Sequence, residues 1–153
     1  MRVIDFLQPD CIVAHLEATT KAAVLAELSA HLAKVIPGVE ASALRHVLEE
    51  RELLASTAIG DGIAIPHGKL DSVGHLVGAL GRAVQGIEFE SIDGKPTHLV
   101  FMLVAPASST GVHLKALARL SRLFRDADFR QRLLAAPSSE AMYQVIAEED
   151  AKY

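Results

Sequence analysis

The sequence has a single cysteine, Cys11, among its 153 residues. An intrachain disulfide and a cysteine-based zinc cluster are therefore both excluded, and a reducing compartment fits this composition. Long hydrophobic runs are also missing, because the longest apolar segments are far too short to span a bilayer. The N-terminus, MRVIDFLQPDC, places Asp5 and Pro9 where a signal peptide needs an apolar segment. We therefore expect a cytoplasmic protein without membrane insertion.

An excess of basic residues is absent as well. The 15 Lys and Arg residues stand against 19 Asp and Glu residues, which gives a formal net charge of −4. Affinity for nucleic acid depends largely on neutralising phosphates with Lys and Arg, so this balance argues against a nucleic-acid partner. The chain shows no internal repeat, low-complexity segment or linker, and its length suits one compact core. We therefore expect residues 1–153 to form a single domain.

Helical periodicity is clear in two N-terminal segments. Apolar residues from Thr20 to Val35 recur at spacings of three and four, which is typical of an amphipathic helix. A second segment of this kind runs from Ala41 to Leu54. Later in the chain, residues that cap helices predict three further helix starts: Ser109 or Thr110, Asp126, and Ser138 or Ser139.

Short apolar segments predict the strands: 11–16, 63–66, 75–84 and 98–105. The last of these is almost entirely apolar, as expected of a central strand covered on both faces. Residues 55–62 are expected to form a loop. Strands in the first two-thirds with helices before and after them predict an α/β fold. We expect a mixed β-sheet of about four to five strands sandwiched between helices, with a helical C-terminal third.

Two polar residues occupy positions where their helices should be apolar. Arg51 continues the buried stripe of the second helix, four residues after Val47, so its side chain is expected to point inward and to need an anion. The simplest explanation is a side chain that pairs with a nearby carboxylate. Neighbouring glutamates are expected to face solvent: Glu49, Glu50 and Glu52. His113 likewise extends the apolar stripe of the helix after Ser109 and is expected to point inward.

A third candidate is His67, in the segment IGDGIAIPHGKLD. It comes just past a predicted strand end, where α/β sheets tend to place their sites. Pro66 fixes the backbone before the histidine, and Gly68 permits a wide range of conformations after it. The other histidines are interpreted as surface or core residues: His15, His31, His46, His75 and His98.

Two chemistries fit this set of residues. In the first, a neutral nitrogen of His67 attacks phosphorus and forms a phosphohistidine. Arg51 would then neutralise the phosphoryl oxygens, while His113 and backbone N–H groups of the glycine-rich loop donate hydrogen bonds. In the second, His67, His113 and a carboxylate such as Asp61 or Asp71 bind a divalent metal. The second is weaker, because no H-x-H or H-E-x-x-H spacing is present and an inward arginine repels a cation.

The segment RELLASTAIGDGIAIPHGKLD (residues 51–71) resembles the signature of the enzyme IIA domains of the fructose and mannitol class, in the bacterial phosphoenolpyruvate-dependent phosphotransferase system (PTS). It is most similar to the nitrogen-related regulatory IIA proteins. Two later segments follow the same family pattern: IEFESIDGKPTHLVFMLVAP and HLKALARLSRLF. The resemblance covers essentially the whole chain and implies a single PTS EIIA type-2 domain over residues 1–153.

The resemblance implies a role for each candidate residue. His67 would be phosphorylated on Nε2 by a histidine-containing phosphocarrier protein, with Arg51 and His113 around the phosphoryl group. Further residues of the same pocket would be Ser56, Thr57 and Gly68. No cofactor is expected. Ala55 and Ala58 stand where the family commonly has glycine, so the loop is expected to differ in shape if it needs a left-handed residue there.

Two functions are compatible with this resemblance. The protein is either a phosphorylation-dependent regulator of partner proteins, such as transporters or sensor kinases, or a sugar-specific relay that passes phosphate to a IIB domain. In both it is a component of a phosphotransferase relay with a phosphohistidine intermediate. The nitrogen-related motif and the lack of a fused IIB, IIC or carrier domain favour the regulator.

Overall fold

A mixed sheet of six strands forms the centre of the computed structural model, which describes residues 1–153. The strand order is β1-β5-β6-β3-β2, and β4 also pairs with β6. The strand bounds are Ile12–Val13 (β1), Ala58–Gly60 (β2), Ile63–Ala64 (β3), His67–Leu70 (β4), Val77–Ile87 (β5) and Thr97–Pro106 (β6). The pairing of β5 with β6 is antiparallel, whereas β3 and β4 run parallel to β6. One strand, β6, therefore holds together most of the sheet.

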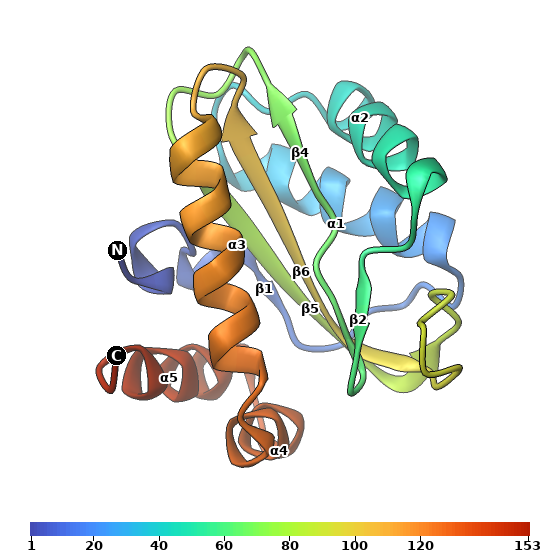
Figure 1. Cartoon of the computed structure of the whole chain (residues 1–153), viewed down its shortest axis with the longest axis vertical. Coiled ribbons are helices and arrows are strands. Elements are labelled where there is room, and N and C mark those ends of the chain that lie inside the picture. Colours follow the sequence, from blue (N-terminus) through green and yellow to red (C-terminus); the bar gives the residue numbers. More distant parts are fainter.

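Helices cover both faces of this sheet (Figure 1). Their bounds are Lys21–Val35 (α1), Ala41–Leu54 (α2), Thr110–Phe124 (α3), Ala127–Ala135 (α4) and Ser139–Asp150 (α5). In the view of Figure 1, α3 crosses in front of the sheet while α1 lies behind it. Two short 3₁₀ turns precede β1, at Val3–Asp5 and Pro9–Cys11. None of these helices has the length and apolar character that a membrane span requires.

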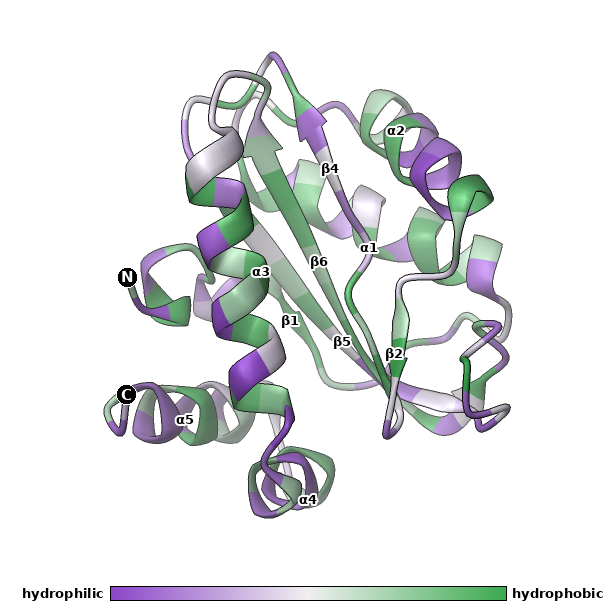
Figure 2. Cartoon of the chain, in the orientation of Figure 1, coloured by the Kyte–Doolittle hydropathy of each residue, from purple (hydrophilic) through white to green (hydrophobic).

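The core is centred on β6, which is green over most of its length in Figure 2. Every residue from Leu99 to Ala105 is buried. Side chains of a strand alternate between the two faces, so a strand covered on both sides must be apolar at every position. The predicted central strand is confirmed for this reason.

The predicted helices agree closely with the structure. The helix α2 has the expected bounds, and the expected capping residues Asp126 and Ser138 accept backbone N–H bonds, as does Thr20 at the start of α1. Thr20 accepts from Ala23 N, Asp126 from Asp128 N, and Ser138 from Ala141 N. Each of these bonds satisfies a donor that the first helical turn leaves free.

The fold class is confirmed, but the sheet has six strands rather than four to five. The difference arises at β2, which was expected to be loop, and at β4, which was expected to follow the strand end. His67 is thus the first residue of a strand, and it lies opposite Leu103 of β6. Both strands are too short to display the alternation of apolar and polar residues that identifies a strand from sequence. Their pairing depends on neighbouring backbone that is distant in sequence.

A buried arginine ties the sheet to the C-terminal helices. Arg82 of β5 is only 4% exposed. Its Nη1 donates to the carbonyls of Leu133 (2.8 Å) and Ala136 (2.7 Å) at the end of α4, and its Nε donates to Ala14 O (3.0 Å). A cation at a helix C-terminus also interacts favourably with the partial negative charge there. Arg82 therefore satisfies carbonyls that would otherwise be buried without donors.

Replacing this arginine tests its contribution to stability. We expect Arg82→Met to lower the free energy of unfolding by about 2 kcal/mol or more, because the buried carbonyls lose their donors. Urea denaturation measures the change. Arg45→Met is the control, since that side chain is half exposed and pairs only with Glu49 on the same helix. The control should change stability by about 0.5 kcal/mol at most, and equal effects of the two variants would contradict the prediction.

Candidate functional site

The imidazole of His67 is held by the backbone of its own segment. His67 Nδ1 lies 2.8 Å from Ile65 O. A carbonyl oxygen can only accept a hydrogen bond, so Nδ1 of the neutral ring must hold the proton and Nε2 keeps its lone pair. The segment itself is fixed to the sheet, because Leu103 N donates to Pro66 O at 2.9 Å. The half-buried ring therefore holds the lone pair of Nε2 in a fixed orientation.

Gly68 permits β4 to pack closely against α2. A Cβ atom at this position would lie 2.6 Å from Cγ1 of Val47, which is closer than two carbon atoms can approach. A side chain at this residue would therefore require Val47 or the β4 backbone to move. The sequence had instead indicated a need for conformational freedom there.

His113 faces His67 from the first turn of α3. The two ring centroids are 5.4 Å apart and the ring planes meet at 75°. His113 is only 7% exposed, and its Nε2 has no hydrogen-bond partner. A neighbouring link joins the same two elements, because Lys69 Nζ donates to Thr110 Oγ1 at 2.8 Å. The expected inward orientation of His113 is therefore found, and the structure brings the two histidines together.

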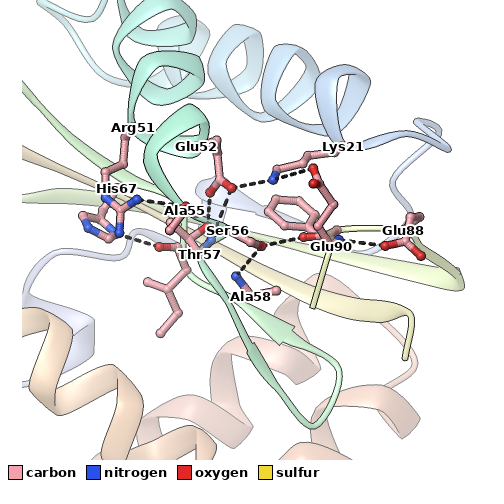
Figure 3. A network of polar contacts seen from close by, with 12 residues as sticks. Lys21, Arg51, Glu52, Ala55, Ser56, Thr57, Ala58, His67, Glu88 and Glu90 are labelled. Atoms are coloured by element: carbon pink, nitrogen blue, oxygen red, sulfur yellow. Dashed lines mark hydrogen bonds and ion pairs between the residues drawn. The ribbon is translucent and has the colours of Figure 1, made fainter. Parts of the chain in front are cut away.

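Arg51 lies beside His67 at the end of α2 (Figure 3). Its side chain is half-buried, and its Nη1 donates to Ala55 O at 2.9 Å. This bond uses one of the five N–H donors of the guanidinium group. Because the bond is to a neutral carbonyl rather than to a carboxylate, the positive charge remains available to an anion at the site.

Burial dominates the electrostatics of both histidines. Burial lowers the pKa of His67, and the positive charge of Arg51 lowers it further, while the bond to Ile65 O and the charge of Glu52 oppose the shift. Burial also lowers the pKa of His113, with smaller contributions in the same direction from His67 and Lys69. Both rings are therefore neutral at neutral pH, which is the state in which an imidazole nitrogen attacks an electrophile.

The hydroxyl groups of Ser56 and Thr57 are directed to protein partners. Ser56 Oγ donates to Phe89 O (2.6 Å) and accepts from Ala58 N (3.1 Å). Thr57 Oγ1 donates a short hydrogen bond to the carboxylate of Glu52. These bonds shape the loop between α2 and β2, so both hydroxyls act on the loop's conformation.

The two alanines of this loop fit without strain. Ala55 is extended, with φ of −172°. Ala58 also avoids positive φ, because the only residues other than glycine with positive φ are Asp61 and Glu90. The loop therefore does not use a left-handed residue at either position where the family commonly has glycine.

Glu52 is a residue of this region for which the sequence-based prediction was wrong. It was expected to face solvent, yet it is only 9% exposed. Its position could have been predicted, because Glu52 follows Leu48 by four residues and Leu44 by eight, and both leucines are buried on α2. The buried stripe of α2 therefore ends on Glu52, and the half-buried Arg51 lies at its edge.

The metal hypothesis finds no supporting cluster. No group of three or more His, Cys, Asp and Glu side chains is placed to hold a metal ion. Asp61 lies at the β2–β3 turn with a carboxylate oxygen 4.0 Å from Arg130 Nη1, and Asp71 is exposed. Neither carboxylate joins the two histidines.

Large apolar side chains are exposed on the elements that bear the site. We call them the apolar rim: Leu53 and Leu54 of α2, Ile59 of β2, and Val112 and Leu114 of α3. Figure 2 shows the green end of α2 where the first two lie. Exposed apolar side chains that gather on one surface are typical of protein docking sites, and these five lie on elements around the two histidines and Arg51.

Comparisons with known proteins identify the family of this chain. The family model described as "Phosphoenolpyruvate-dependent sugar phosphotransferase system, EIIA 2" matches residues 5–149. A nitrogen regulatory protein of Bradyrhizobium diazoefficiens is 42% identical over 96% of this chain and 95% of its own length. The fructose-specific EIIABC component of Bacillus subtilis is 37% identical over 98% of this chain, which spans 24% of that protein.

Solved structures show the same fold. The nitrogen regulatory protein IIA-Ntr of Neisseria meningitidis superposes with a TM-score of 0.86 at 31% identity, over 93% of this chain and 97% of that one. The mannitol IIA of Escherichia coli superposes with a TM-score of 0.77 at 22% identity, over 91% of this chain and 97% of that one. Sequence and structure together confirm the resemblance: the chain belongs to the EIIA type-2 family of the phosphoenolpyruvate-dependent sugar phosphotransferase system.

Proposed function

We propose that this protein is a cytoplasmic regulatory IIA protein of the nitrogen-related phosphotransferase system, phosphorylated on His67 Nε2 by a histidine-containing phosphocarrier protein. The observation that best supports this is the bond from Nδ1 to Ile65 O, because it leaves Nε2 unprotonated. Membership of the EIIA type-2 family is consistent with phosphoryl transfer.

The proposed step is an exchange of one P–N bond for another. The lone pair of His67 Nε2 forms a bond to phosphorus while the bond from phosphorus to the carrier's imidazole breaks, and its electron pair returns to that ring. Arg51 stabilises the negative oxygens by charge and hydrogen bonds. His113 donates a hydrogen bond to the same group, which gives a partner to the unpaired Nε2 of this buried ring. Gly68 leaves room for the strand on which the nucleophile lies.

The apolar rim is the surface that we propose for docking the carrier. It borders the elements that bear Arg51, His67 and His113, so a carrier bound there brings its imidazole to the phosphoryl position. Ser56 and Thr57 support the pocket through the conformation of the loop, since their hydroxyls are bonded to Phe89 and Glu52.

Regulation rather than relay is favoured by the similarity to nitrogen regulatory proteins over nearly their whole length. Phosphorylation adds about −1.5 to −2 charges at pH 7 and so alters which surfaces can bind the rim. The similarity to a fructose-specific EIIABC component supports the second function, transfer of phosphate to a IIB domain. One of the structural neighbours is the mannitol IIA of Escherichia coli, solved in complex with phosphorylated mannitol IIB.

Phosphate acceptance tests the role of His67. Incubation with phosphoenolpyruvate, enzyme I and the phosphocarrier should add one acid-labile phosphate per chain, because an N–P bond hydrolyses in acid. We expect His67→Ala to accept none. His15→Ala, which changes an exposed histidine elsewhere, should accept phosphate as the unaltered protein does. Acceptance by His67→Ala would overturn the assignment.

The pH dependence follows from the two lowered pKa values. An NMR titration should give midpoints for His67 and His113 below the roughly 6.5 of an unperturbed histidine. The unfolded chain then binds protons at a higher pH than the folded one, so the free energy of unfolding should fall as pH drops below about 6.5. Neutral rings persist above that pH, where acceptance should be insensitive to pH. Midpoints at or above 6.5 would contradict this prediction.

Partner capture separates the regulator from the relay. We expect His67→Ala and His67→Asp proteins to recover different sets of partners from cell extract, because the aspartate brings a negative charge to the phosphoryl position. Recovery of transporters or sensor kinases by one variant supports the regulator. Rapid transfer of phosphate from the phosphorylated protein to a IIB domain, without such partners, would establish the relay instead.

A further inference from the structure

A buried ion pair lies behind the loop that precedes the site. Lys21 Nζ of α1 is 2.7 Å from Glu52 Oε2 of α2, and both side chains are largely buried. Lys21 also contacts Glu90 at 3.3 Å and lies over the ring of Phe89. Figure 3 shows this pair on the opposite side of the end of α2 from Arg51 and His67. Neither member of the pair touches the phosphoryl position of the proposed function.

A continuous series of hydrogen bonds runs from this pair to the imidazole. The carboxylate of Glu52 accepts from Thr57 N at 3.2 Å and from Thr57 Oγ1. Thr57 O in turn accepts from Ile65 N at 3.0 Å. Ile65 O accepts from His67 Nδ1 at 2.8 Å. The carbonyl that sets the tautomer of His67 thus belongs to a peptide segment anchored, through Thr57, to Glu52.

The same carboxylate also anchors the segment that holds Arg51. Arg51 donates to Ala55 O, two residues before Thr57. By binding Thr57, Glu52 closes the turn between the end of α2 and β2, and Ala55 lies within that turn. Buried ion pairs add little to stability because desolvation offsets their attraction. A carboxylate held in such a pair, however, orients the groups that donate hydrogen bonds to it, which here are the N–H and hydroxyl of Thr57.

We infer that Glu52, held by Lys21, is a positioning residue for phosphoryl acceptance: it fixes the 55–57 loop and, through Ile65, the tautomer and orientation of His67. This inference rests on the proposed function, since it gives the nucleophile of that reaction its support. It also gives Thr57 a definite role, which is to connect Glu52 to the strand before His67.

The charge of Glu52 gives a readout of its proximity to the His67 ring, separate from the rate and the tautomer. Four groups affect the pKa of His67 or face its ring: Arg51 and Glu52 from α2, His113 from α3, and the Ile65 carbonyl. Among these, the Glu52 carboxylate raises the pKa. Glu52→Gln keeps the shape and an acceptor for Thr57 but removes the charge. The pKa of His67 should therefore fall below its value in the unaltered protein.

The central experiment compares Glu52→Gln with Glu49→Gln. Glu49 is a matched control because it lies one turn earlier on α2 and is bonded to Arg45 instead of the loop. Single-turnover phosphorylation by the phosphorylated carrier should be about 10-fold slower or more in Glu52→Gln at saturating carrier, with an unchanged half-saturating concentration. The control should behave as the unaltered protein. The ¹⁵N shifts of the His67 imidazole should show a larger population with the proton on Nε2 in Glu52→Gln than in Glu49→Gln or the unaltered protein.

A second pair of variants covers the case in which Glu52→Gln does not fold. Thr57→Val removes the hydroxyl bond and should slow phosphorylation, whereas Thr57→Ser keeps the hydroxyl and should restore the rate. Rates and ¹⁵N shifts unchanged in both Glu52→Gln and Thr57→Val would overturn the inference. Absence of phosphorylation in the unaltered protein would instead reject the proposed function, and the ¹⁵N shifts, measured without phosphate, keep the two failures apart.

Discussion

The bond from His67 Nδ1 to Ile65 O is the interaction on which the chemistry of this site depends. Either ring nitrogen of a neutral histidine can carry the proton, and a hydrogen bond that fixes the proton on one nitrogen leaves the lone pair on the other. Here the acceptor of that hydrogen bond is a backbone carbonyl, Ile65 O, which lies between β3 and β4 of the sheet. The parallel pairing of β4 with β6 holds His67 and the segment before it against the central strand of the sheet.

The other groups of the site come from separate elements packed on this sheet. Arg51 ends α2 and His113 begins α3, so the pocket lies where two helix termini meet the start of β4. Gly68 makes that meeting possible, because any side chain there would displace Val47 of α2. The buried β6 therefore has two roles: it forms the centre of the core, and its pairing with β4 sets the position of His67 within the sheet.

Sequence reasoning found the groups whose position follows from helical phase. Arg51 and His113 interrupt apolar stripes, and an interruption is visible without a structure. Glu52 lies on the buried side of α2 but was assigned to solvent, because Glu49, Glu50 and Arg51 directly precede it and a run of charged residues suggests an exposed face. The short strands β2 and β4, the close packing at Gly68 and the carbonyl partners of Arg82 could not be predicted, since each depends on backbone distant in sequence.

The electrostatics of the site are consistent with a phosphoryl acceptor whose partner binding depends on whether it is phosphorylated. Burial keeps both imidazoles neutral, so the charged side chains that act on the rings are Arg51 and, behind the loop, Glu52 at His67, and Lys69 at His113. A phosphoryl dianion on Nε2 would pair with Arg51 and would stand beside the exposed leucines of the apolar rim. A partner that binds the rim through apolar contacts would then have to desolvate that charge, which is costly without a cation of its own. Under the proposed function, partners that lack such a cation bind the unphosphorylated form, and partners that supply one bind the phosphorylated form.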